Sequence, residues 1–132
     1  MEQVEIRDGS RSAVFRSPIP FTGDRLWVAL EADGLRAEHD VYVFGQDVNG
    51  LAAFFQDLAD SWRGWGDVKV WNSIEHDLRI EARSDAGRHC LLNVVVRDGP
   101  IPTWNARVDD ISVDAGEDLA SLARSFAAWT QR

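Results

Sequence analysis

The dipeptide of Asp33 and Gly34 constrains the fold of this chain more than any other feature of its sequence. It lies in the middle of "DRLWVALEADGLRAEHDVYVF", between two segments in which apolar and polar residues alternate. Asp followed by Gly accepts the positive φ angles of a two-residue type I′ turn, so the segment predicts a β-hairpin of fixed register. One face is then apolar, with the opposed pairs Leu26 and Val41, Val28 and His39, and Leu30 and Ala37. The other face is polar and carries two aromatic rings, with Trp27 opposite Asp40 and Arg25 opposite Tyr42.

A second hairpin is predicted over "DLRIEARSDAGRHCLLNVVV", with its turn at Asp85, Ala86 and Gly87. A two-residue loop would set Ile80 against the polar Asn93, whereas a three-residue loop brings only apolar residues together on one face. We therefore expect the three-residue loop. Its apolar pairs are Leu78 with Val94, Ile80 with Leu92, and Ala82 with Cys90, and its reverse face carries Arg79, Glu81, Asn93 and His89.

The remaining elements are a hairpin over residues 3–17, a strand over residues 103–113 and two helices. The strand alternates as far as Asp109 and Asp110, where a slip in phase indicates a β-bulge. One helix is expected over residues 48–62, and the other follows Asp114 as its capping residue. The Pro-rich stretches at 17–20 and 99–102 indicate loops within a single domain, residues 1–132. We predict an α+β fold in which both helices pack on one face of a single twisted antiparallel sheet of about 6–8 strands.

Composition limits the environment and the partners of the chain. Its 132 residues carry a net charge of −8, which disfavours binding to nucleic acid or to an anionic membrane and favours a basic protein partner. No apolar run is long enough to span a bilayer, and the first residues lack the pattern of a secretory signal. With Cys90 as the only cysteine, no intramolecular disulfide can form. We expect a bacterial cytoplasmic location.

Neither a metal site nor a catalytic site can be assembled from the sequence. The three histidines and Cys90 show no metal-ligand spacing, and no Gly-rich loop opens a helix. Cys90 is expected in the core, and Asp109 with Asp110 is more typical of a solvated strand irregularity than of a catalytic pair. The prediction is therefore no catalytic residue, no cofactor and no metal. The better candidate is the reverse face of the sheet, with Arg25, Trp27, Tyr42, Trp71, Arg79, Glu81, His89 and Asn93 as its binding residues.

From about residue 62 onward the chain resembles a family of small, uncharacterised, mostly actinobacterial domains. The pattern is a Trp-containing strand, a turn, an alternating strand, a Gly-His-like turn and a closing helix that begins Ala-Gly-Glu. More loosely, it resembles the immunity proteins that accompany WapI-type toxins. The matching residues are Trp71, Ser73, Leu78, Ile80, Gly87, His89, Gly116 and Glu117, while Arg88 separates Gly87 from His89 and His76 stands where a Gly is expected. The first resemblance implies an uncharacterised domain, and the looser one implies an immunity-type function.

The cluster "WRGWGDVKVW" at residues 62–71 leaves the side of one tryptophan open. Trp62 ends the apolar stripe of the first helix and is expected in the core, and Trp65 is expected as a lid over the corner that follows. A two-residue turn at Glu75 and His76 would set Trp71 against Ile80 on the helix-covered face. A three-residue loop at residues 73–75 would send Trp71 to the reverse face, and we favour it because His is a poor residue for positive φ.

Three functions fit these features. The leading hypothesis is a non-enzymatic protein-binding domain, immunity-like, that holds a basic partner through the reverse sheet face. The second is a small-molecule binder or cryptic enzyme with a pocket between sheet and helices. The third is a homodimeric structural protein, formed through edge strands or sheet faces.

Overall fold

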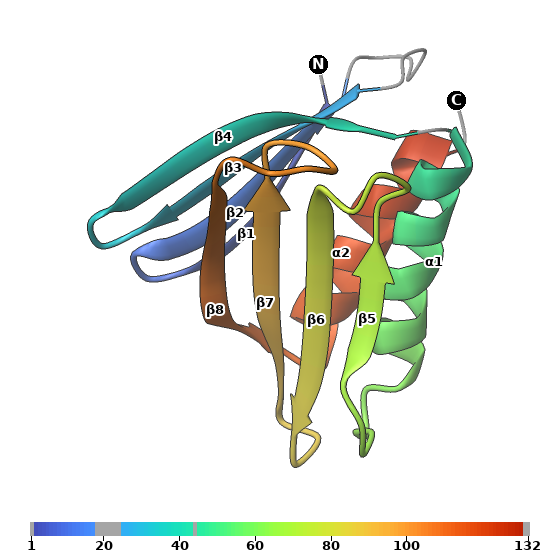
Figure 1. Cartoon of the computed structure of the whole chain (residues 1–132). Helices are drawn as coiled ribbons and strands as arrows, with labels where there is room; N and C mark the ends of the chain where they lie inside the picture. The colour runs from blue at the N-terminus through green and yellow to red at the C-terminus, as the bar shows by residue number, and fades with distance from the viewer. Residues whose placement is uncertain (1, 18–24, 44, 131–132) are drawn as a thin grey trace.

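The protein folds as four strands and a helix, followed by four further strands and a second helix (Figure 1). The computed structural model describes residues 2–17, 25–43 and 45–130, so the predicted loop at residues 18–20 lies outside the described residues. This order of elements is the predicted one. The elements are β1 (Glu2–Asp8), β2 (Arg11–Ser17), β3 (Arg25–Ala32), β4 (Leu35–Tyr42), α1 (Gly45–Asp60), β5 (Lys69–Asn72), β6 (Leu78–Asp85), β7 (His89–Arg97), β8 (Asn105–Asp114) and α2 (Glu117–Thr130).

The strands form two antiparallel sheets, which corrects the prediction of one sheet of 6–8 strands. The first sheet has the order β1-β2-β3-β4 and the second has the order β5-β6-β7-β8. Strands β1 and β8 lie next to each other, but side chains join them in place of a backbone ladder. Asp8 Oδ2 accepts a hydrogen bond from the Ser112 amide at 3.1 Å, and Arg11 donates to the Asp110 carbonyl at 3.1 Å. Tight turns between successive strands specify each sheet locally, whereas pairing of β1 with β8 would depend on residues about a hundred positions apart.

Both helices pack on the same side of the strands, as predicted, and they contact each other along their length (Figure 1). The centre of the core is aromatic. The ring of Phe126 in α2 stacks on Phe55 of α1 at 4.6 Å between centroids and meets Phe15 of β2 edge-on at 5.5 Å. Within the described residues, neither helix is long and apolar enough to cross a membrane. We call the sheet faces turned to the helices inner and the opposite faces outer.

Strands β3 and β4 follow the sequence prediction residue by residue. Strands β3 and β4 pair as Leu26 with Val41 and Arg25 with Tyr42, the register that the turn at Asp33 and Gly34 specifies. Gly34 has a φ of 77°, but Asp33 is not among the described residues with positive φ, so the turn keeps the predicted register without being the predicted type I′ turn, which needs positive φ at both positions. The predicted apolar pairs lie on the inner face, and Leu26, Val28, Leu30 and Val41 are fully buried there.

The β6–β7 hairpin has the predicted three-residue loop, displaced by one residue along the chain. Asp85 pairs with His89, so the loop consists of Ala86, Gly87 and Arg88, and every pair is shifted by two positions. Ile80 faces Val94, Ala82 faces Leu92, and Cys90 faces Ser84 in place of Ala82. The reason is that Ala86 adopts positive φ together with Gly87, at 51° and 74°, which lets the Arg88 amide close the turn on the Asp85 carbonyl at 2.9 Å. Because the shift is even, each residue keeps its predicted face.

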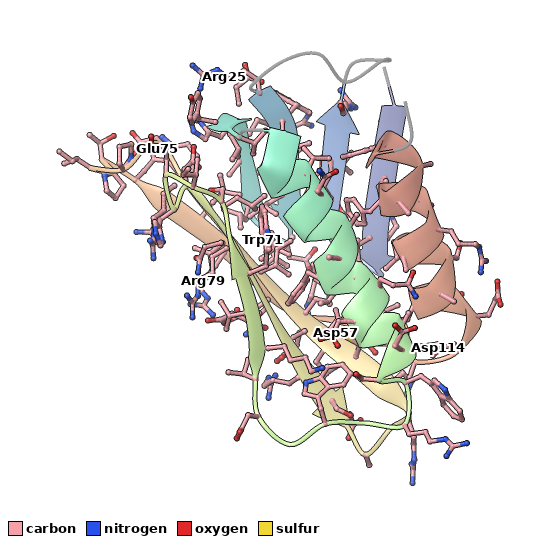
Figure 2. The ribbon with its side chains drawn as sticks, turned by 90° about the vertical axis from the view of Figure 1, so that its right-hand side faces the viewer. Arg25, Asp57, Trp71, Glu75, Arg79 and Asp114 are labelled. Carbon is pink, nitrogen blue, oxygen red and sulfur yellow. The ribbon has the colours of Figure 1, made fainter. Side chains whose placement is uncertain are left out.

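The β5–β6 register is the alternative that we did not favour. Trp71 pairs with Ile80 and lies on the inner face, against α1, where a Cβ added at Gly50 would stand 3.2 Å from its Nε1 (Figure 2). His76 does adopt positive φ, at 59°. Ser73 compensates for this conformation, because its carbonyl accepts from the His76 amide at 3.0 Å and its hydroxyl accepts from the Leu78 amide at 3.0 Å. The connection is thus wider than two residues but keeps the two-residue register.

Two helix ends also differ from the prediction. Helix α1 ends at Asp60, so Trp62 lies beyond it and is 49% exposed, with Arg63 stacked over its ring at 4.9 Å, instead of being part of the core. Trp65 closes the following corner, as predicted, and its Nε1 donates to the Ala82 carbonyl at 3.1 Å. Asp114 is the last residue of β8 and not the cap of α2, which begins at Glu117.

Candidate functional site

The structure divides the predicted binding residues between three surfaces. Arg25, Trp27 and Tyr42 lie on the outer face of the first sheet, and Arg79, Glu81, His89 and Asn93 lie on the outer face of the second. Trp71 lies on the inner face, and Figure 2 shows it on the side of the second sheet turned to α1, with Arg79 on the opposite side. The expected single binding surface is therefore divided between the outer faces of two sheets, and Trp71 belongs to neither of them.

On the first sheet the aromatic residues belong to ordinary cross-strand packing. The Arg25 guanidinium lies over the Tyr42 ring, 5.2 Å from its centroid, as their opposed positions predict. Trp27 is half-buried between Arg16 and Asp40 in the neighbouring strands. Its indole Nε1 is shielded from solvent and has no acceptor among the described residues. This face is a packed polar surface.

On the second sheet, charged residues form a connected cluster around Glu81. Arg79 Nε donates to Glu81 Oε2 at 2.9 Å, and Asn93 Nδ2 donates to Glu81 Oε1 at 3.1 Å. Arg107 of β8 approaches the same Oε1 at 3.6 Å and donates from Nε to Asp109 at 2.9 Å. We call this set the Glu81 network. Its members are Arg79, Glu81, Arg83, Asn93, Arg107, Asp109 and Asp110.

The bulge in β8 brings the last members into the Glu81 network. The pairing of β7 with β8 shifts between Leu92 and Val94, so that both Asp109 and Asp110 stand opposite Asn93. Asp110 has a φ of 57°, its amide donates to Asn93 Oδ1 at 3.0 Å, and its carboxylate is hydrogen-bonded to Arg83. The predicted bulge is confirmed, and its effect is to turn two carboxylates toward the arginines of the sheet.

Sequence reasoning missed Arg107, and it did not connect the two aspartates with the cluster. The signal was present, because Arg107 alternates with the inward-facing Ala106 and Val108 and must therefore point outward. What the sequence lacked was the order of strands that sets β8 beside β7 with this offset.

The hydrogen bonds of the Glu81 network keep it charged. Those from Asn93 and Arg79 lower the pKa of Glu81 below its usual value, and the charge of Arg107 adds to the effect. The hydrogen bond to Asp109 raises the pKa of Arg107, helped by the negative charge of Asp109 and then of Glu81. A lowered carboxyl pKa and a raised guanidinium pKa both favour the ionised pair, so the network is an ordered set of charges at neutral pH.

At the far end of the second sheet, His89 lies between two aspartates. Its Nε2 is 3.3 Å from Asp114 Oδ1, and its Nδ1 is 3.8 Å from Asp85 Oδ2. All three side chains are substantially exposed. The two aspartates therefore add negative charge at this end of the sheet.

The side chains that could act as nucleophile or base, Cys90 and the group of Ser73, Asp77 and His39, have structural roles. Cys90 is buried, and burial raises its thiol pKa to about 12. Ser73, Asp77 and His39 are near one another, but Asp77 stands between the other two, accepting from Ser73 Oγ at 2.7 Å and lying 3.4 Å from His39 Nε2. A base must contact the nucleophile that it activates, so this order holds a turn and does not activate the serine. Among the described residues no group of three His, Cys, Asp or Glu side chains could hold a metal ion.

The hollows on the described surface are shallow. One of about 230 Å³ lies where β1 and β8 meet α2, and its lining includes Glu5, Arg7 and Asp118. Another of about 320 Å³ lies between Trp62 and the start of α2. Both open broadly to solvent, and pockets for small ligands typically measure about 300–1,000 Å³ and enclose most of the ligand.

Comparison with known proteins gives a family without a function. Residues 18–132 match the model described as "Family of unknown function (DUF6228)". No curated protein and no solved structure matches the chain. The match confirms an uncharacterised domain, while the actinobacterial source and the likeness to WapI-type immunity proteins stay predictions.

Proposed function

This chain belongs to the DUF6228 family, whose function is unknown, and we propose that it is a non-enzymatic domain that binds a basic protein through the outer face of its second sheet. The observation that carries the proposal is the Glu81 network, in which Arg79 and Arg107 are held in place by Glu81, Asn93 and Asp109. Arginines already fixed in position lose less conformational entropy when a partner binds, and arginine is enriched among the residues that dominate interface energies.

The surroundings of the network support contact with a protein. Figure 1 shows β5 to β8 side by side, with both helices behind them and none of the described helices or strands in front. The outer face also presents apolar area, since Val70 is 38% exposed and Leu91 is partly exposed beside Arg83. An apolar area within a polar, hydrogen-bonding rim is typical of protein interfaces.

Charge favours a basic partner. The three arginines of the network are balanced by Glu81, Asp109 and Asp110, and Asp85 and Asp114 add negative charge at the end of the same sheet. The whole chain carries −8, which would draw a basic protein toward it and repel an acidic one. Capture of a basic toxin by an immunity-type protein would have this character.

The test is affinity capture from a native bacterial lysate by the tagged chain, followed by mass spectrometry and titration calorimetry with the purified partner. Arg79→Ala is expected to weaken binding at least about tenfold, because it removes a pre-positioned interface arginine. The matched control is Arg16→Ala, which removes an exposed arginine from the outer face of the first sheet. A stoichiometric basic partner lost with Arg79→Ala and kept with Arg16→Ala is the expected result, and equal binding by both variants would refute the proposed face.

A small-molecule binder is the second candidate, and the hollow of about 230 Å³ beside α2 is the observation in its favour. It lies where β1 and β8 meet α2, and it is lined by the charged Glu5, Arg7 and Asp118. Saturating this hollow with a ligand would raise the unfolding temperature of the wild type but not of an Asp118→Ala variant. Thermal shift against a library of small polar metabolites distinguishes the two candidates.

A further inference from the structure

Strand β4 forms a free edge of the first sheet. Figure 1 shows it as the outermost strand, with no other described helix or strand beyond it along most of its length. In a two-residue hairpin the residues that flank the turn, here Ala32 and Leu35, hydrogen-bond to each other, and the pattern then alternates along the strand. Leu35, Ala37, His39 and Val41 therefore bond to β3, while Arg36, Glu38 and Asp40 direct their backbone groups outward. No hydrogen bond to those outward backbone groups occurs within the described part of the chain.

The same alternation explains where this free edge ends. The amide of Tyr42, which has the outward phase, donates to Asp77 Oδ2 at 3.2 Å. Asp77 lies in the connection between β5 and β6 of the second sheet and is 97% buried. Its carboxylate occupies the outward amide of Tyr42, so the free edge ends there. The open part of the edge is limited to residues 35–40.

The charges along this open part are self-complementary in one register only. Two copies of β4 that meet antiparallel across a two-fold axis must pair outward residues with outward residues. If Arg36 opposes its own copy, or Glu38 opposes Asp40, like charges face each other. If Arg36 opposes Asp40, then Glu38 meets Glu38, and Tyr42, already closed by Asp77, would have to pair as well. Setting Arg36 opposite Glu38 gives two opposite-charge pairs, no like-charge pair, and a ladder that fits the open residues. Because Arg36 already donates to Glu38 of its own strand at 2.9 Å, this register joins two existing ion pairs into one network of four charges.

We propose that the edge of β4 is a homodimerisation site, at which a second copy of this chain pairs antiparallel with Arg36 opposite the partner's Glu38. The two-fold axis then passes beside Ala37, which meets its own copy on the inner face. Ala37 and Leu35 are only partly buried in the single chain, so the dimer covers apolar area at the same place. The first sheets of the two copies join into one sheet of twice the width. This inference is independent of the proposed outer-face function, which concerns the other sheet.

Charged residues on a free edge commonly prevent association of two sheets. The test must therefore distinguish an edge whose charges prevent dimerisation from one whose charges stabilise a dimer. Sedimentation equilibrium of the 132-residue chain is expected to give a mass that rises with concentration from 14.8 kDa toward twice that value. Arg36→Glu sets like charges opposite each other twice and should raise the dimer dissociation constant at least about tenfold. The double variant Arg36→Glu/Glu38→Arg reverses both pairs and should restore the dimer. Arg16→Glu, off the edge on the same sheet face, is the charge control and should leave the dimer unchanged.

Cross-linking tests the register directly. Opposed residues in a non-hydrogen-bonded antiparallel pair have Cα atoms about 4.5 Å apart, which a disulfide can span. Ala37→Cys should therefore form a covalent dimer on mild oxidation, while Leu35→Cys, which would oppose the partner's His39, should not. A monomer mass at every concentration, a dimer that Arg36→Glu leaves intact, or equal cross-linking of the two cysteine variants would each overturn the proposal.

Discussion

Gly87, in the loop between β6 and β7, lies against the backbone of Arg63 in the segment that joins α1 to β5. A substitution at Gly87 tests this close approach. The φ of 74° at Gly87 is unfavourable for any residue with a Cβ, and a Cβ added there would stand 2.5 Å from the carbonyl oxygen of Arg63. The neighbour is backbone and cannot turn aside as a flexible side chain would. Gly87→Ala is therefore expected to cause two separate losses of stability, one from backbone conformation and one from overpacking.

Gly34 separates these two contributions. It has nearly the same φ, 77°, but a Cβ added there meets nothing within 4 Å. Gly34→Ala should destabilise the fold by about 1 kcal/mol, the usual cost of the left-handed conformation for an L-residue. Gly87→Ala should cost about 3 kcal/mol, because the forced shift of the Arg63 backbone adds roughly 2 kcal/mol of overpacking.

Urea denaturation at 25 °C, with midpoint and slope compared between the two variants and the wild type, measures both free energies. An unchanged slope shows that the difference comes from the folded state. Equal destabilisation by Gly34→Ala and Gly87→Ala would refute the close approach of Gly87 to Arg63.

Three further predictions follow from single contacts. Glu81→Gln should lower the free energy of unfolding by about 1 kcal/mol at pH 7. Because the pKa of Glu81 is lowered in the folded state, the stability that its charge contributes is present above the unfolded pKa and is lost as the pH falls through the folded pKa. Urea midpoints of wild type and variant should therefore converge as the pH falls below the unfolded pKa of a glutamate, about 4.3, and through the lower folded pKa, and a constant difference would contradict the charged network. Trp71→Ala should lower the free energy of unfolding by roughly 2 kcal/mol, because the ring is half-buried against α1. Trp62→Ala should change it by less than about 0.5 kcal/mol, because that ring is largely exposed. A larger effect of Trp62→Ala in chemical denaturation would show that Trp62 is part of the core. Cys90, with its pKa raised to about 12, should react with a thiol reagent at pH 8 only when the chain unfolds, and rapid labelling of the folded protein would show that the thiol is accessible.

Local sequence determined the hairpins and the faces of their residues. Asp33 and Gly34 specify the β3–β4 register because a two-residue turn admits one pairing, and Asp109 with Asp110 marks the bulge because the alternation breaks there. Even where the β6–β7 loop is displaced, the apolar alternation keeps Ile80 inward and Glu81 outward. These features depend on residues close together in the chain, so their physics is visible in the sequence.

Tertiary structure decided the features that depend on distant residues. The way the two sheets meet depends on contacts of Asp8 and Arg11 with β8, and the Glu81 network needs Arg107 from another strand. The side of Trp71 depended on whether His76 would accept positive φ, and the bonds from Ser73 and the buried Asp77 made that conformation available. An intrinsic backbone preference of about 1–2 kcal/mol is readily outweighed by a few buried hydrogen bonds and a large ring packed on a helix. The sequence thus determined which residues share a face, and only the packing of distant segments decided which faces meet.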